Sequence, residues 1–320
     1  MRLCRQKPLK SPIILYMKRL PIKIIGFETP RRVFLQGLQL GADKPSRVYI
    51  FIHGLGGSIF SRIDLLSRLA DKSSAVITFN NRGSGLINGF KRRRGNKYQY
   101  AGLGGLAHEV FSDCVDDISG AVDYALNLGV RDVFLIGHST GCQKSVYYLA
   151  KKKNSPVKGA VLLAPVSDYA ALQKEVEPVV YRRALKEAKK LVAAGRSHAL
   201  LPAEAWRHPI DAQRFLSLYT PESREEIFGY ASRRRPDLLK KVQSPLYIFL
   251  AEEDEYHDRP TQEIAAWFKD ALFGRSAGLA VINDVGHDFS PAEGKISRMI
   301  KSWSKRCTGK GPGHFKRRLD

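Results

Sequence analysis

The stretch DVFLIGHSTG, residues 132–141, decides the fold. Its first five residues form a mostly apolar run, which predicts a buried strand. Gly137 and Gly141 then flank Ser139, and a helical pattern follows over residues 139–151. A serine between two glycines at a sharp strand-to-helix turn is exposed at the end of its strand. We therefore expect the Ser139 hydroxyl to lie at the carboxyl edge of a parallel sheet.

Apolar runs like this one recur and alternate with amphipathic stretches. We expect strands at 22–27, 32–39, 48–52, 75–79, 132–136, 157–163, 245–250 and 278–282, the first two of them antiparallel. We expect helices at 59–69, 109–128, 139–151, 262–272 and 293–303. Strands that alternate with helices indicate an α/β fold, with a mostly parallel eight-stranded sheet and helices on both faces.

One long interval interrupts this alternation. Residues 164–244 contain no convincing strand, but helical patterns occur at 178–194 and 222–232. A segment of this length does not stay without structure inside a compact domain. We expect a helical lid inserted between two strands of the sheet.

A serine hydroxyl becomes a strong nucleophile when a histidine takes its proton and a carboxylate orients that histidine. Asp254 follows the expected strand 245–250, and His287 follows the expected strand 278–282. Groups just past the carboxyl ends of parallel strands gather at one edge of a sheet. We therefore expect Ser139, Asp254 and His287 to act together as nucleophile, acid and base.

Each of these three positions has an alternative. Ser139 could be an ordinary helix N-cap, since serine is favoured there. His287 competes with His257, which lies three residues after Asp254. Asp254 competes with other carboxylates of the same loop, which could be only a solvated acidic segment: Glu252, Glu253, Glu255 and Asp258. The complete set in the order serine, acid, histidine favours Ser139 as the nucleophile. His287 is preferred over His257 because His257 precedes the last expected strand.

A glycine-rich loop supplies a fourth component. The segment HGLGG, residues 53–57, follows the expected strand 48–52. Its glycines free the backbone to aim N–H groups at a developing negative charge. We expect the N–H groups of Leu55 and Thr140 to form an oxyanion hole. His53 and His138 are expected to be structural, holding neighbouring loops by hydrogen bonds.

These motifs resemble the α/β-hydrolase superfamily over residues 30–305, and the resemblance implies a serine hydrolase of carboxylic esters that needs no cofactor. The elbow GHSTGCQ, residues 137–143, also looks similar to a little-characterised branch that includes fungal siderophore ester hydrolases. The fungal pattern continues with Asp where this chain has Lys144. The same triad could serve a thioesterase or an acyltransferase, so the resemblance does not specify the substrate. The expected partner is a small acyl substrate.

The four cysteines show no metal-ligand spacing and form no disulfide framework, so we expect no metal and a reducing compartment. The lid contains three aromatic residues that could line an acyl pocket or could equally belong to a core: Trp206, Tyr219 and Phe228.

The formal net charge is +22, and most of it lies at the two ends. Residues 1–26 hold seven Lys or Arg and no acid, and residues 295–320 hold nine against one acid. Another basic cluster, residues 91–97, is expected to be a loop. This distribution favours weak contact with anionic surfaces over specific nucleic-acid binding. A rival interpretation is a catalytically silent module that is tethered by its basic ends to anionic lipid or nucleic acid.

We expect a basic N-terminal extension (1–26), a core (27–163 and 245–305), the lid (164–244) and a basic tail (306–320). The apolar run at 13–17 is too short to span a bilayer or to act as a signal sequence. The sequence thus predicts a cytoplasmic protein, and Met17 could be its true first residue.

Overall fold

A computed structural model describes residues 20–232 and 235–309. Its single sheet has ten strands. They are β1 (Ile22–Glu28), β2 (Val33–Gly41), β3 (Arg47–Ile52), β4 (Ser74–Phe79), β5 (Asn88–Arg94), β6 (Lys97–Gly104), β7 (Asp132–His138), β8 (Val157–Leu163), β9 (Leu246–Ala251) and β10 (Ala277–Ile282). The proposed start at Met17, most of the basic extension and most of the basic tail lie outside the described residues.

The strands are arranged in the order β10-β9-β8-β7-β3-β4-β2-β5-β6, and β1 pairs with β2. The six strands from β10 to β4 are parallel, whereas β2 runs antiparallel to β1, β4 and β5. The mostly parallel α/β fold is therefore confirmed, and all eight expected strands are present. β1 begins within the segment that the sequence assigned to the basic extension.

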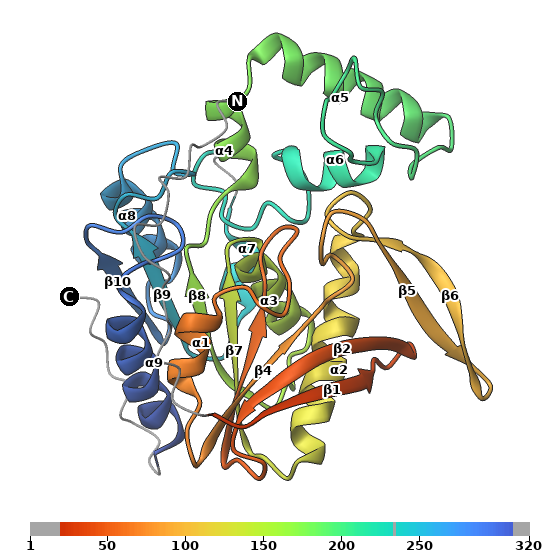
Figure 1. The fold of residues 1–320 in the computed structure, drawn as a ribbon. Coiled ribbons are helices and arrows are strands. Elements are labelled where there is room, and N and C mark those ends of the chain that lie inside the picture. Colours follow the sequence, from red (N-terminus) through yellow and green to blue (C-terminus); the bar gives the residue numbers. More distant parts are fainter. Residues whose placement is uncertain (1–19, 233–234, 310–320) are drawn as a thin grey trace, which may run out of the picture.

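The expected number of eight strands is wrong, because β5 and β6 form an additional hairpin that projects from the body (Figure 1). The sequence predicted a loop here, since five basic residues conceal the strand pattern. Both strands are largely exposed, so they do not need an apolar face that packs against the core. Glu28 of β1 stabilises the hairpin instead, accepting bonds from Arg93 Nε and the Tyr98 hydroxyl.

Helices cover both faces of the sheet (Figure 1). They are α1 (Ile63–Leu69), α2 (Cys114–Asn127), α3 (Thr140–Lys151), α4 (Asp168–Glu175), α5 (Pro178–Ala193), α6 (Ala212–Tyr219), α7 (Asp237–Lys241), α8 (Thr261–Ala271) and α9 (Glu293–Thr308), with a 3-10 turn at Phe111–Asp113. α1 and α9 pack on one face, and α2, α3 and α8 contribute to the core on the other. No helix in the described ranges is long and apolar enough to cross a membrane.

The central strand β3 shows why the sheet requires two layers of helices. Val48, Ile50 and Ile52 belong to one core, and Tyr49 and Phe51 belong to the other. Successive side chains of a strand point to opposite faces, so a continuous apolar run must be covered on both sides.

Helices α4, α5 and α6 lie between β8 and β9 in the sequence and sit above the sheet edge (Figure 1). They share a separate small core that includes Trp206 and Phe215. The expected helix at 222–232 is wrong, because that segment consists of turns and irregular backbone. Trp206 and Tyr219 pack in this small core, and Phe228 packs in the core below the sheet.

A buried chain of four alternating charges connects these helices to α3. Lys144 Nζ of α3 lies 2.6 Å from Glu109 Oε1, and Arg214 of α6 lies 3.0 Å from Glu109 Oε2. Arg214 also pairs with Glu225. Burial by itself raises the pKa of Glu109, but Lys144 and Arg214 outweigh it and hold the pKa below its ordinary value.

We predict that Glu109→Gln lowers the free energy of unfolding by about 3–5 kcal/mol, because two buried cations lose their shared carboxylate. Urea denaturation followed by circular dichroism would measure the change. Glu187→Gln is the matched control, since Glu187 forms only a loose 3.7 Å pair with Lys190 on α5. Such a pair contributes under about 0.5 kcal/mol. Similar losses in both variants would contradict a structural role for the buried chain.

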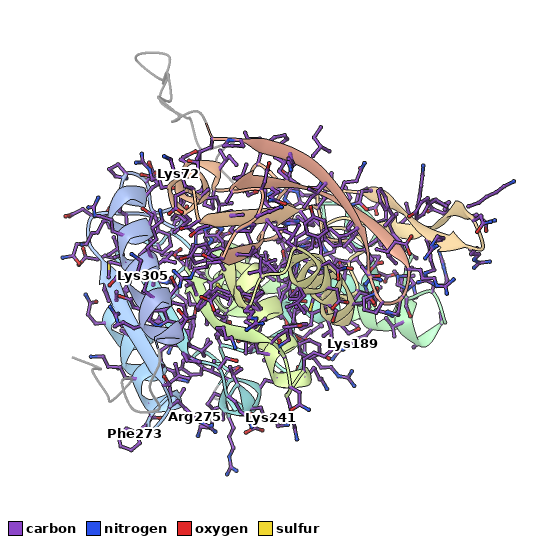
Figure 2. The ribbon with its side chains drawn as sticks, turned by 90° about the horizontal axis from the view of Figure 1, so that it is seen from below. Lys72, Lys189, Lys241, Phe273, Arg275 and Lys305 are labelled. Atoms are coloured by element: carbon purple, nitrogen blue, oxygen red, sulfur yellow. The ribbon has the colours of Figure 1, made fainter. Side chains whose placement is uncertain are left out.

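Exposed basic side chains occur at several separate places on the described body (Figure 2). The exposed residues Lys72, Lys189, Lys241 and Lys305 project from widely separated edges (Figure 2).

Candidate active site

Ser139 occupies the turn between β7 and α3 with an unusual backbone conformation, φ 54° and ψ −128°. The turn is so tight that its glycines have no room for a side chain. A Cβ on Gly137 would lie 2.4 Å from the carbonyl oxygen of Gly141, and one on Gly141 would lie 2.1 Å from that of Ile52. The two glycines of the motif are therefore required by close backbone approach.

The loop after β3 lies against this turn. A Cβ added to Gly54 would lie 2.9 Å from Ser139 Cβ, so only glycine permits the approach. In the described part of the chain, the backbone N–H groups of Leu55 and Thr140 donate no hydrogen bond. The N–H of Thr140 opens helix α3, where the helix dipole favours negative charge.

Asp254 and His287 meet because β9 and β10 end side by side. The last residues of these parallel strands, Ala251 and Ile282, are register partners. His287 Nδ1 donates to Asp254 Oδ2 at 2.8 Å, and the N–H of Tyr256 donates to Asp254 Oδ1 at 3.0 Å. Burial raises the pKa of Asp254, but the bond from His287 outweighs it and leaves the pKa below its ordinary value.

Three of the four competing carboxylates have other contacts. Glu255 accepts the backbone N–H of His287, Glu252 accepts the N–H of Asp284, and Asp258 pairs with Arg259. Among the residues with described positions, Asp254 is the carboxylate that bonds the His287 ring.

His257 also lies near Asp254, with Nε2 at 3.6 Å from Oδ2. Its Nδ1 faces the Thr261 hydroxyl at 2.9 Å, and burial lowers its pKa. His257 is not among the residues that line the cleft at Ser139, which include His287.

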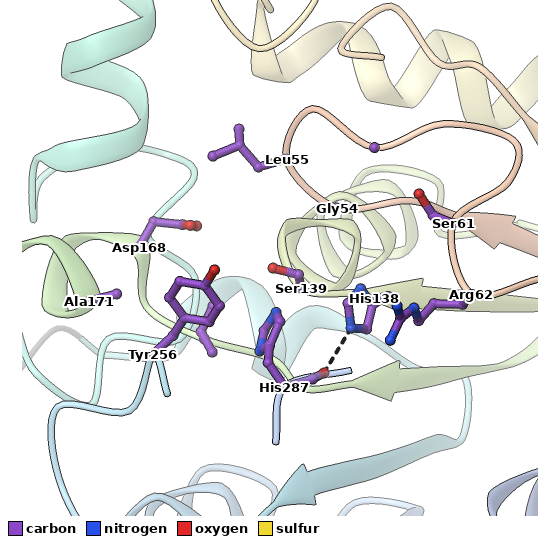
Figure 3. A pocket seen from close by; sticks show the side chains of 12 residues that line it. Gly54, Leu55, Ser61, Arg62, His138, Ser139, Asp168, Ala171, Tyr256 and His287 are labelled. Carbon is purple, nitrogen blue, oxygen red and sulfur yellow. Dashed lines mark hydrogen bonds between the residues drawn. The ribbon is translucent and has the colours of Figure 1, made fainter. Parts of the chain in front are cut away.

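That cleft has a volume of about 320 Å³ and opens at the carboxyl edge of the sheet (Figure 3). Ser139 points into it from the elbow, beside the ring of His287. The remaining lining residues are Gly54, Leu55, Gly57, Ser61, Arg62, His138, Val166, Asp168, Ala171 and Tyr256. The structure thus places Ser139, His287 and Leu55 on one cleft, with Asp254 behind His287.

His138 and His53 support the walls of the cleft. His138 Nε2 donates to the backbone oxygen of His287 at 3.0 Å, as the dashed line in Figure 3 marks. Burial and the neighbouring His287 lower the pKa of His138 to about 3, so this ring is neutral. His53 Nδ1 donates to the Gly54 oxygen at 2.9 Å. Burial and then Lys144 lower the pKa of His53 to about 4. The His138 bond reaches a neighbouring loop, as expected, whereas the His53 bond stays within its own loop.

Sequence reasoning missed Asp168, Tyr256 and Arg62 as cleft residues. Arg62 is the N-cap residue before helix α1 and has a positive φ, and its guanidinium pairs with Asp288 at 3.4 Å. Asp168 is the first residue of α4. The Tyr256 and His287 rings meet edge to face, with their centroids 4.6 Å apart. None of the three belongs to a recognisable motif, because the tertiary fold brings their segments together.

The sheet order, the elbow and the cleft at the carboxyl edge define the α/β-hydrolase class of fold. A solved structure of this class, the alpha/beta hydrolase GrgF from Penicillium sp. sh18, has a TM-score of 0.60 to this chain at 18% sequence identity. The match covers 90% of this chain and 99% of that one. The α/β-hydrolase fold that the motifs predicted is confirmed. The chain belongs to the family described as protein of unknown function (DUF1749), whose model matches residues 41–301.

Two curated relatives carry names that refer to esters. The bifunctional esterase/perhydrolase DCH of Acinetobacter calcoaceticus is 27% identical over 155 residues, which are 44% of this chain and 55% of that protein. The fusarinine C esterase sidJ of Aspergillus fumigatus is 30% identical over 131 residues, 29% of this chain and 36% of that protein. The matches thus span about half of the first relative and a third of the second.

We predict that Gly141→Ala lowers the free energy of unfolding by about 1–3 kcal/mol or more, because the added methyl would overlap the Ile52 oxygen. Gly294→Ala on α9 is the control. A Cβ there would lie 3.6 Å from the nearest atom, and alanine in a helix is favoured over glycine by up to about 1 kcal/mol. Thermal and urea unfolding measure both variants. A Gly141→Ala protein as stable as the wild type would show that the elbow is not constrained as described.

Proposed function

We propose that this protein is a serine hydrolase that cleaves a carboxylic ester of a small molecule. The 2.8 Å bond between His287 and Asp254, at the cleft into which Ser139 points, carries this proposal. The names of the two curated relatives and the fold class support the ester as the bond that is cleaved.

In the proposed reaction, His287 removes the proton of the Ser139 hydroxyl while its oxygen attacks the ester carbonyl carbon. The Asp254 carboxylate holds His287 in the tautomer with Nε2 free, and it stabilises the imidazolium that forms. The N–H groups of Leu55 and Thr140 stabilise the negative charge that develops on the carbonyl oxygen, each by about 3–4 kcal/mol.

His287 then donates the proton to the departing alkoxide, which leaves as the alcohol and yields an acyl-enzyme on Ser139. Water, deprotonated by the same imidazole, attacks the acyl carbon and releases the carboxylic acid. His287 returns the proton to Ser139. No metal or organic cofactor takes part in this sequence of steps.

We further propose that residues 164–244 act as a lid over the core formed by residues 27–163 and 245–305. Asp168 and Ala171 come from this segment and line the cleft, so the lid contributes directly to substrate contact. The protein is proposed to work in the cytoplasm, with its basic ends in weak contact with anionic surfaces.

We predict that Ser139→Ala abolishes labelling by a fluorophosphonate probe and lowers the hydrolysis of short p-nitrophenyl esters by roughly 10³-fold or more. Ser302→Ala, at an exposed position of α9, is the control and should label and turn over as the wild type does. A well-folded wild type that neither labels nor hydrolyses these esters would overturn the proposal. The silent, tethered module would then be the leading interpretation.

We predict different outcomes for the two histidines near Asp254. His287→Ala removes the proposed base and should lower kcat by roughly 10³-fold or more, whereas His257→Ala should lower it by less than about tenfold. The same esters measure both rates, and circular dichroism verifies folding. A larger loss of kcat in His257→Ala than in His287→Ala would contradict the proposal and identify His257 as the base.

A further inference from the structure

One carboxyl group in the cleft has no role in the proposed reaction. Asp168 begins α4 and is half-buried. It lines the same cleft as Ser139 and points into it from the side opposite His138 and Arg62 (Figure 3). The Tyr256 ring lies between Asp168 and His287 in this view.

A buried glutamine fixes the orientation of this carboxyl group. Gln143 of α3 donates through Nε2 to Asp168 Oδ2 at 2.8 Å and to the Val166 oxygen at 2.9 Å. Gln143 lies one helical turn after Ser139, so the nucleophile and the carboxyl group are held by the same rigid helix. In the described ranges, Oδ1 of Asp168 accepts no hydrogen bond and Asp168 forms no ion pair.

The buried ion pairs next to the cleft do not include Asp168, and their positive and negative charges are equal in number. The buried chain of Lys144, Glu109, Arg214 and Glu225 contains two cations and two carboxylates that pair with one another. Arg214 and Lys144 attract the Asp168 carboxylate from a distance, but their direct ion pairs are with Glu109 and Glu225. Burial and then the neighbouring Glu225 and Glu226 raise the pKa of Asp168 well above its ordinary value. An added cation in the cleft would oppose this rise in pKa and favour the ionised carboxylate.

We propose that Asp168 forms a subsite for a substrate ammonium group, so that the cleft prefers esters whose acyl or alcohol part carries a primary amine. The amine donates a charged hydrogen bond to Oδ1 of Asp168. Tyr256 lines the same cleft. This substrate class rests on the proposed ester hydrolase function of Ser139.

The preference is tested with two pairs of esters that differ only by an ammonium in place of a methyl group. In one pair, p-nitrophenyl 6-aminohexanoate and p-nitrophenyl heptanoate, the acyl part differs. In the other pair, 5-aminopentyl acetate and hexyl acetate, the alcohol part differs, and release of acid is measured. For each pair the quantity compared is the ratio of kcat/KM for the ammonium ester to kcat/KM for the neutral ester.

We predict that Asp168→Asn lowers this ratio by about 10- to 100-fold in at least one pair, as expected for loss of a hydrogen bond between two charged groups. Asparagine keeps the oxygen that accepts from Gln143, so the variant retains that contact. Glu175→Gln, at the exposed far end of α4, removes the same charge from the same helix and should keep the wild-type ratio.

Two results would overturn the subsite. One is a ratio that stays within about twofold of the wild type in both pairs. The other is an equal fall in Glu175→Gln, which would indicate a long-range effect of net charge. A carboxylate that only stabilises the start of α4 would give the first of these results together with a changed unfolding transition.

Failure of the ester hydrolase proposal can be distinguished from failure of the subsite. Binding of ethyl 6-aminohexanoate and of 5-aminopentyl acetate to Ser139→Ala, measured by calorimetry, requires no turnover. Tighter binding of either ester to Ser139→Ala than to the double variant with Asp168→Asn would support the subsite even if no ester is cleaved. Equal binding of both esters to the two proteins would refute it, while fluorophosphonate labelling of the wild type separately tests Ser139.

Discussion

The backbone of Ser139 is the constraint on which the rest of the structure depends. A non-glycine residue with φ 54° and ψ −128° is strained and persists where its surroundings enforce it. Here the enforcement comes from contact on three sides, by the paired strands β3 and β7 and by helix α3. The loop at Gly54 can reach the serine because β3 and β7 end at the same level, with Ile52 opposite Gly137. The cleft follows from this arrangement, since the carboxyl ends of all the central strands open toward it.

Helix α3 positions other groups besides the nucleophile Ser139. Its buried face presents Gln143 toward Asp168 and Lys144 toward Glu109, so one helix connects the nucleophile, the wall of the cleft and the ion chain that reaches α6. Buried ion pairs of this kind are weak evidence for stability, because desolvation offsets much of their attraction. Their geometric requirements are strict, however, and they hold α6 in a defined position above the core. The inserted helices therefore meet the cleft through fixed contacts.

Local patterns predicted the core well and the exposed parts poorly. The six parallel strands are mostly apolar, because strands that are covered on both faces of a sheet tolerate few polar residues. The hairpin β5–β6 has no such apolar run, and its charged residues are typical of a loop. Its contact with β1, where Glu28 accepts hydrogen bonds from Arg93 and Tyr98, is visible only in the structure. The helix expected at 222–232 is absent for a related reason. Ile227 and Phe228 of that segment are buried by contacts with the core, and periodicity cannot distinguish such contacts from a helical stripe.

The sequence by itself determined the elbow, the order of Ser139, Asp254 and His287, and the class of the fold, because these depend on short motifs and on the alternation of strands and helices. Only the tertiary structure decided which carboxylate bonds His287, that His257 faces Thr261, and that Asp168 and Tyr256 share the cleft with Ser139. Those facts depend on the register of β9 against β10 and on the path of the inserted helices. Both are set by packing between segments far apart in the chain, which no local pattern encodes.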